Sequence, residues 1–92
     1  MSVRWSQEAR DDLDRLADFV AAHDPLRANE IEFQLNQAPQ KLLEFRRRGA
    51  RLSRFDPREV REFRIGRYLL RYELIDSDVR VLRFFHARED RL

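Results

Sequence analysis

Residues 58–90 read REVREFRIGRYLLRYELIDSDVRVLRFFHARED, and this stretch decides the fold. It holds three runs typical of β-strands, at Glu59–Ile65, Arg67–Ile75 and Val79–His86. Short turns at Gly66-Arg67 and Asp76-Ser77-Asp78 separate these runs and have the length of hairpin connections. The stretch therefore predicts a three-stranded antiparallel meander.

The last of these runs carries apolar residues at both strand parities. Val79, Val81 and Phe85 are expected to point to one face of the sheet, and Leu82 and Phe84 to the other. A strand with two apolar faces needs cover on both of them, and a chain of 92 residues is expected to supply only one. The sequence thus predicts a partner that covers the second face.

Two helices are predicted upstream of the meander. Ser6 is a suitable N-cap for the first helix, which carries an apolar stripe at Ala9, Leu13, Leu16, Ala17 and Val20. Val3-Arg4-Trp5 comes before it and is expected to form an edge strand. The predicted order β-α-α-β-β-β corresponds to an α+β fold, a single domain over residues 1–92 with the helices packed on one sheet face.

The second helix is predicted to start at Asp24-Pro25, an N-cap followed by proline at the first helical position. Its apolar stripe keeps its phase through Pro39, which indicates one kinked helix rather than two. Gly49 is expected to terminate it as a C′ residue. Residues 50–57 then form a connector, and Arg46-Arg47-Arg48 is either a complement to the helix dipole or a functional basic patch.

The composition excludes several classes of function. The chain has no cysteine, which excludes disulfides and thiolate metal sites. Its histidine and acidic residues show no metal-ligand spacing, and two glycines cannot make a phosphate-binding loop. No metal or cofactor is therefore expected. Without a signal-like or membrane-spanning apolar run, we expect a soluble cytoplasmic protein that does not contact the membrane.

Charge is distributed unevenly along the chain. Residues 1–45 carry five basic and nine acidic side chains, whereas residues 46–92 carry fourteen basic and eight acidic ones. Eighteen of the nineteen basic residues are arginine, whose planar fork suits carboxylates, phosphates and stacking. Codon bias accounts for the number of arginines as well as any function does, but it does not account for their concentration in the C-terminal half of the chain. The C-terminal half is predicted to meet an acidic protein or a nucleic acid.

The ordered set of residues resembles the RelE/ParE superfamily of small bacterial toxins, and most of all its ParE branch. The segments that carry the resemblance are Trp5-Ser6 with Ala9 and Leu13, Asp24-Pro25, Leu42-Leu43-Glu44-Phe45 with Gly49, Arg61 with Phe63-Arg64-Ile65-Gly66, Tyr68-Leu69-Leu70-Arg71-Tyr72, and Val81-Leu82-Arg83-Phe84-Phe85-His86-Ala87-Arg88. They span essentially the whole chain. Each segment alone is weak evidence for the family. The ordered set is more specific for the superfamily than for the target on which such a toxin acts.

The resemblance implies a toxin of a type II toxin–antitoxin module that arrests growth when it is free. It implies a cognate antitoxin that folds around the toxin, with promoter DNA bound only indirectly, through that antitoxin. ParE-like members inhibit DNA gyrase, which is an interaction function and needs no catalytic set in the toxin. The shortage of acid and base candidates fits this reading, so the chain is not expected to be an enzyme.

Two alternatives stay open. RelE-like members are ribosome-dependent endoribonucleases that cleave mRNA, and under that reading His86 would be the acid or base, with Arg61, Arg64 and Arg71 as phosphate clamps. This chain has Leu69 and Glu89 where RelE-like nucleases typically use arginine, which counts against that reading. The other alternative is a decayed toxin that binds its antitoxin and poisons nothing.

The expected contact residues lie in the last strands and the tail. His86 is either structural and partner-binding or, under the nuclease reading, catalytic. The aromatic residues are read as core before they are read as stacking platforms for bases. The full set expected to carry toxicity or antitoxin contact is Arg61, Arg64, Arg71, Arg83, His86 and Arg88.

Overall fold

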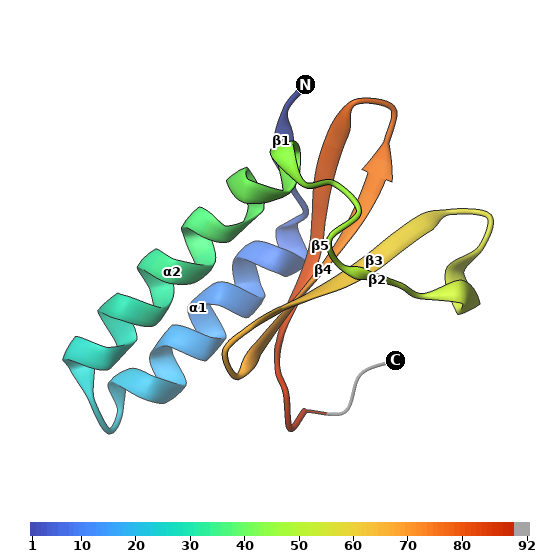
Figure 1. Ribbon diagram of the computed structural model, residues 1–92. Helices are drawn as coiled ribbons and strands as arrows, with labels where there is room; N and C mark the ends of the chain where they lie inside the picture. Colours follow the sequence, from blue (N-terminus) through green and yellow to red (C-terminus); the bar gives the residue numbers. More distant parts are fainter. Residues whose placement is uncertain (90–92) are drawn as a thin grey trace.

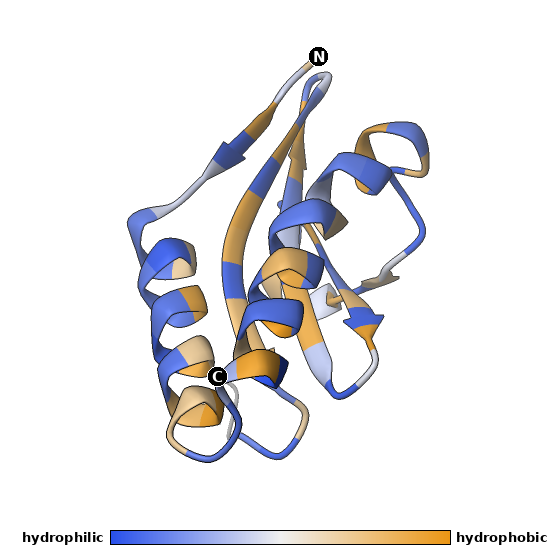
Figure 2. Cartoon of the chain, turned by 90° about the vertical axis from the view of Figure 1, so that its left-hand side faces the viewer, coloured by the Kyte–Doolittle hydropathy of each residue, from blue (hydrophilic) through white to orange (hydrophobic). Residues whose placement is uncertain are grey.

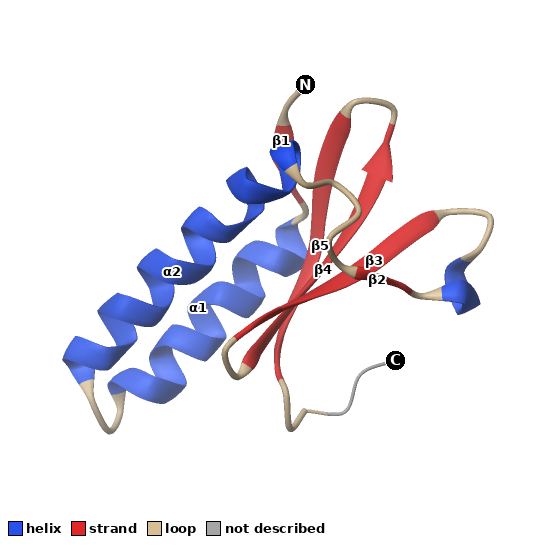
Figure 3. Ribbon diagram, viewed as in Figure 1, coloured by secondary structure: helices blue, strands red, loops and turns tan. Residues whose placement is uncertain are grey.

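The computed structural model describes residues 1–89 and contains a helical hairpin on a five-stranded sheet (Figure 1). The helices are α1 (Gln7–Ala21), α2 (Pro25–Glu44) and the short 3₁₀ helix η1 (Ser53–Phe55). The strands are β1 (Val3–Trp5), β2 (Ala50–Arg51), β3 (Glu59–Ile65), β4 (Tyr68–Ile75) and β5 (Asp78–His86). The predicted α+β fold is confirmed, with both long helices on one side of the sheet (Figure 3).

The strands lie in the order β1-β5-β4-β3-β2. The meander of β3, β4 and β5 is antiparallel as predicted, and β1 is an edge strand that pairs parallel with β5. The sequence predicted the strands of the meander to within one residue at each end. It missed β2 and η1, which lie inside the predicted connector and are too short to show a periodic pattern.

Capping side chains start both long helices where the sequence predicts. The Ser6 hydroxyl accepts a hydrogen bond from the Ala9 N–H at 3.0 Å, and the Asp24 carboxylate accepts one from the Arg27 N–H at 3.1 Å. Hydrophobic and hydrophilic residues alternate around both helices (Figure 2). The hydrophobic stripes pack on Val79, Val81 and Phe84 of β5, and this contact forms the main core.

The predicted end of the second helix is wrong by several residues. Helix α2 runs unbroken through the buried Pro39, as expected, but ends at Glu44 instead of reaching Gly49. Gly49 has another role, because a Cβ there would lie 2.7 Å from the Glu62 carbonyl oxygen and 2.9 Å from the Tyr72 ring. Only glycine lets the chain pass this close to β3 and β4.

A bulge in β5 overturns the predicted facing of its side chains. Arg71 of β4 pairs with Arg83, and the next residue, Tyr72, pairs with Val81, so Leu82 is the extra residue. Beyond the bulge the alternation shifts by one position. Phe84 therefore joins Val79 and Val81 against the helices, and Phe85 points to the opposite side.

The prediction that a partner must cover the second sheet face is also wrong. We call the side turned away from α1 and α2 the outer sheet face. It carries Val60, Glu62, Arg64, Leu69, Arg71, Glu73, Arg80, Arg83 and Phe85, with Arg4 on β1. Phe85 is only 4% exposed there, because arginine side chains of the same chain lie across its ring. The chain thus covers both faces of β5 by itself.

Candidate functional site

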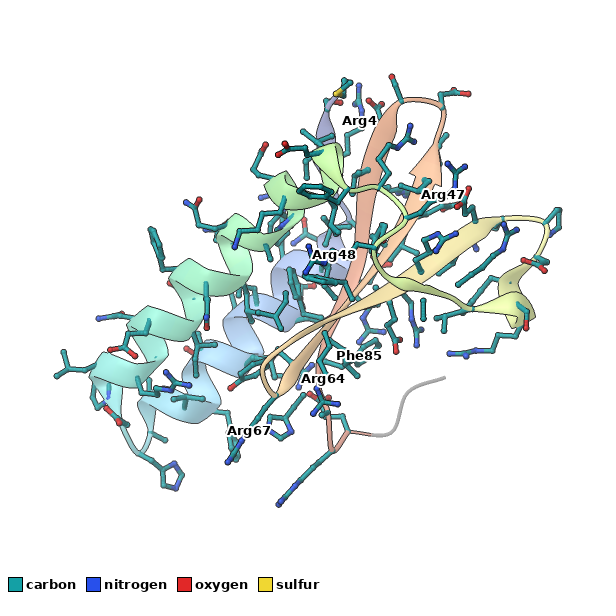
Figure 4. All side chains as sticks on the ribbon, in the orientation of Figure 1. Arg4, Arg47, Arg48, Arg64, Arg67 and Phe85 are labelled. Atoms are coloured by element: carbon teal, nitrogen blue, oxygen red, sulfur yellow. The ribbon has the colours of Figure 1, made fainter. Side chains whose placement is uncertain are left out.

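The outer sheet face brings together three of the six predicted contact residues. Strand register sets Arg71 directly beside Arg83, and Arg64 in the same row as Leu69 and Phe85. Arg64 is exposed at the end of the sheet where β3 turns into β4, close to Phe85 (Figure 4). These three arginines form one basic surface, as the sequence predicts for its C-terminal half.

Arg71 is the buried centre of this surface. Its guanidinium bonds the Glu62 carboxylate at 3.0 Å and lies between two aromatic rings, 5.4 Å from the centre of Phe55 and 4.9 Å from that of Phe85. Arg83 also lies over Phe85, at 4.9 Å, and Arg54 lies over Phe55. The result is a stack of alternating guanidinium and aromatic groups.

Arg83 also reaches around the edge of β5 to Asp12 on α1. The two groups form a pair of hydrogen bonds, of 2.6 and 3.0 Å, and these hydrogen bonds raise the pKa of the guanidinium further. The same Asp12 carboxylate accepts the Phe84 backbone N–H at 3.0 Å. Because β1 ends at Trp5, Asp12 takes the place of a neighbouring strand at this part of the β5 edge.

Arg61 does not belong to the outer sheet face. It pairs with Tyr72 and faces the helix side, where it donates to the Glu59 carboxylate and to the carbonyl oxygens of Arg47 and Gly49. The hydrogen bond from Arg61 lowers the pKa of Glu59, and a second one from Arg47 adds to it. Arg61 therefore ties the segment after α2 to the sheet.

His86 and Arg88 lie at the end of β5, away from the arginine stack. The His86 ring meets Tyr68 edge-on at 5.4 Å, and its Nδ1 accepts a hydrogen bond from the Arg88 N–H at 3.1 Å. Glu89 accepts the His86 backbone N–H and an Arg15 guanidinium hydrogen. Burial alone would raise the pKa of Glu89, but these two hydrogen bonds outweigh it, and the pKa is lowered.

His86 and Arg88 both line a groove of about 1200 Å³. We call it the hairpin groove, because it lies between the C-terminal half of α1, the N-terminal half of α2, the β3–β4 turn and the end of β5. Its apolar lining includes Phe19, Ile31 and Ile65. Arg15, Arg27, Arg67 and Arg88, against the acid Glu89, make it basic, and Phe19 is 73% exposed. A basic, partly apolar groove suits an acidic amphipathic segment.

Within residues 1–89 there is neither a candidate metal site nor a helix that could span a membrane. Among residues 1–89, no group of three histidine, cysteine or acidic side chains is placed to hold a metal ion. In the same range, no helix has both the length and the apolar character needed to cross a bilayer.

Sequence reasoning missed Asp12, Arg80 and the groove residues around Phe19. Asp12 lies next to Leu13 within the apolar stripe of α1, and a charged residue in such a stripe is a usable signal. Arg80 sits between two core valines, which marks it as outward-facing. The groove has no such signal, since segments far apart in the sequence assemble it.

Comparisons with known proteins agree with the fold. A family model described as the ParE toxin of the type II toxin–antitoxin system parDE matches residues 3–91. The Toxin RelE2 of Caulobacter vibrioides is 32% identical over 85 residues, which cover 92% of this chain and 93% of that protein. The solved chromosomal ParDE system from P. aeruginosa contains a chain with a TM-score of 0.78 and 20% identity, covering 94% of this chain and 95% of that one.

Proposed function

The chain belongs to the ParE toxin family of type II toxin–antitoxin systems, and on that premise we propose that it arrests growth by binding DNA gyrase. In this proposal a cognate antitoxin silences it by covering its exposed binding surface. The toxin acts as a protein ligand and carries out no chemical step. The cytoplasm, where gyrase works, is its proposed location.

One observation carries this choice of mechanism. Three of the four groups that the nuclease reading requires are engaged inside the fold. Arg61 holds two carbonyl oxygens and Glu59, Arg71 is bonded to Glu62 between two rings, and the His86 Nδ1 accepts the Arg88 N–H. Arginines held in this way are poorly placed to clamp a transferring phosphate.

The hairpin groove is the surface on which we propose that the antitoxin lies. The outer sheet face already has its apolar residues covered, whereas the groove leaves Phe19 exposed beside four arginines. An acidic helix with an apolar stripe fills such a groove and offsets its charge. The antitoxin would then extend from the groove across the arginines of the last strands.

The mRNA interferase reading remains the second candidate, because His86 faces the basic groove and a relative carries the RelE2 name. Under that reading His86 would exchange a proton with the RNA, and Arg67 and Arg88 would hold its phosphates. The two candidates differ in their target, so a single set of assays separates them.

The deciding experiment is a supercoiling assay with purified gyrase, relaxed plasmid, ATP and the full chain freshly released from its antitoxin. We expect loss of supercoiling with accumulation of linear DNA, and we expect His86→Ala to inhibit as well as the wild type. His23→Ala, a change at the exposed end of the helical hairpin, is the matched control. If supercoiling is unimpaired while growth still stops, and His86→Ala alone abolishes the arrest, the interferase reading replaces this one.

A further inference from the structure

The outer sheet face carries more positive than negative charge. Five arginines lie on its strands, Arg4, Arg64, Arg71, Arg80 and Arg83, against the three acids Glu62, Glu73 and Asp78. Arg71 engages Glu62, and Arg58 engages Glu73 with hydrogen bonds of 2.8 and 3.0 Å. Both glutamates of the face are thus already matched by arginines.

Two pairs of arginines face each other directly across neighbouring strands. Arg4 of β1 is the register partner of Arg80 of β5, and Arg71 is the partner of Arg83. Neighbouring strands lie only about 4.8 Å apart, and like charges placed directly opposite destabilise a sheet. Glu62 and Asp12 already offset the second pair through their hydrogen bonds with Arg71 and Arg83. Asp78 relieves the first pair only in part, since its contact with Arg4 is 3.4 Å long and it also accepts hydrogen bonds from Ser2. A bound anion would offset the remaining repulsion between Arg4 and Arg80.

The outward arginines are held in ordered positions. Arg54 lies over Phe55, and Arg83 lies over Phe85 while Asp12 also holds it. Stacking on a ring fixes a guanidinium without neutralising it, so less rotamer entropy is lost when a ligand binds. Arg4 and Arg64 lie at opposite ends of the sheet (Figure 4), so the charge extends over its whole length.

The rest of the molecule steers an anion toward this face. Asp11, Asp14 and Asp18 are exposed on α1, on the opposite side of the sheet. The unequal charge of the two halves of the chain therefore becomes an acidic helical layer and a basic outer sheet face. An approaching polyanion is repelled by one and attracted by the other.

From this arrangement we propose that the outer sheet face binds the phosphate backbone of duplex DNA directly, a contact that the sequence had assigned to the antitoxin alone. Recognition of phosphates needs positive charge and the forked donors of arginine, and this face has both. It does not need an apolar pocket. A protein partner would need an apolar anchor. Within residues 1–89, Ile75 is the one exposed large apolar residue on the sheet, at the end of β4. Phe55 and Phe85 lie under guanidinium groups, which disfavours base stacking and therefore single strands.

Fluorescence anisotropy of a labelled duplex of arbitrary sequence, titrated with the full chain over a range of salt concentrations, tests this proposal. The double variant Arg4→Gln with Arg80→Gln removes the outward pair at one end of the face. We expect it to bind about tenfold or more weaker at 0.1 M salt and to lower the slope of log affinity against log salt by about two. The control Arg10→Gln with Lys41→Gln removes the same charge from the helices and should keep the wild-type slope.

A second variant, Arg54→Gln with Arg64→Gln, keeps the contact between Arg4 and Asp78 and guards against a folding defect in the first. Thermal melts by circular dichroism accompany each protein. The proposal is overturned if the wild type does not bind the duplex, or if the control weakens binding as much as the outer-face variants. It is equally overturned if the face binds a polyglutamate peptide but no DNA. Gyrase is absent from this assay, so its outcome is independent of the supercoiling result.

Discussion

At the scale of the residue, Asp12 connects the two halves of this fold. Its side chain is 4% exposed and accepts hydrogen bonds from Arg83, from Arg15 and from the Phe84 backbone N–H. A buried carboxylate is costly unless it is paired and fully hydrogen-bonded, and Asp12 is both. It thereby fixes α1 against the part of β5 that β1 does not reach.

Asp12→Ala is expected to lower the free energy of unfolding by about 2–3 kcal/mol, because it leaves the Phe84 N–H and the Arg83 guanidinium without their shared acceptor. The partial exposure of Arg83, 40% for its side chain, keeps the loss at this level. Urea unfolding followed by circular dichroism measures it. Asp14→Ala, at an exposed position of the same helix, is the matched control, and equal losses in both variants would contradict the role of Asp12.

At the scale of the element, β4 places two buried charged residues on the outer sheet face. Arg71 and Glu73 are both buried there, two positions apart on the same side of the strand. Each is paired with a residue from a neighbouring segment, Arg71 with Glu62 and Glu73 with Arg58. These ion pairs make the sheet depend on ionised carboxylates.

The stability of the protein should therefore fall in acid. Hydrogen bonds from Arg58 lower the pKa of Glu73 below its ordinary value of 4.5, although burial opposes them. A carboxylate whose pKa is lower in the folded chain stabilises the fold fully above about pH 4.5, and this contribution is lost as the pH falls through the folded-state pKa.

Glu73→Gln is thus expected to be less stable than the wild type at pH 7, with a gap that closes below about pH 4.5. Urea unfolding at a series of pH values from 7 downward measures the gap. Arg58→Ala should remove the same pH-dependent part, since it breaks the same pair. A gap that stays constant over the whole range would rule out this linkage.

At the scale of the whole molecule, the fold turns a division along the chain into two layers of opposite charge. It also creates the hairpin groove, whose lining comes from four separate segments. Two phenylalanines on the helices are similarly exposed, Phe19 at 73% and Phe33 at 69%, and of these two only Phe19 lines the groove. They form a natural pair for testing where the antitoxin lies.

Phe19→Ala is expected to weaken binding of the cognate antitoxin about tenfold or more, because covering a phenylalanine side chain contributes roughly 1.5–3 kcal/mol. Phe33→Ala removes the same side chain outside the groove and should bind like the wild type. Isothermal titration calorimetry with the purified antitoxin measures both affinities. If Phe33→Ala weakens binding and Phe19→Ala does not, the antitoxin lies on the other face of α2.

The free chain should be better folded than its sequence alone indicates. The sequence predicted a sheet face that only a partner would cover, but Arg71 and Arg83 cover Phe85 from within the chain. What remains exposed is the groove and the apolar residues of the hairpin. Aggregation of the free toxin, where it occurs, is therefore expected to start at the helices.

Local sequence signals predict where the two long helices start and where the strands of the meander lie, because capping residues, helical stripes and strand alternation act over a few neighbouring positions. Ser6, Asp24-Pro25 and the run Tyr68–Ile75 each predicted its element before any contact was known. The toxin family was likewise readable from the ordered residues.

How side chains from distant segments meet depends on the three-dimensional packing of the chain. The bulge at Leu82, the pairing of Asp12 with Arg83 and the place of Gly49 against Tyr72 depend on strand register and on helix packing. A shift of one residue in register exchanges the two faces of a strand, and no local pattern encodes such a shift. The sequence therefore names the basic residues, and the fold decides which of them bind groups inside the chain and which face outward.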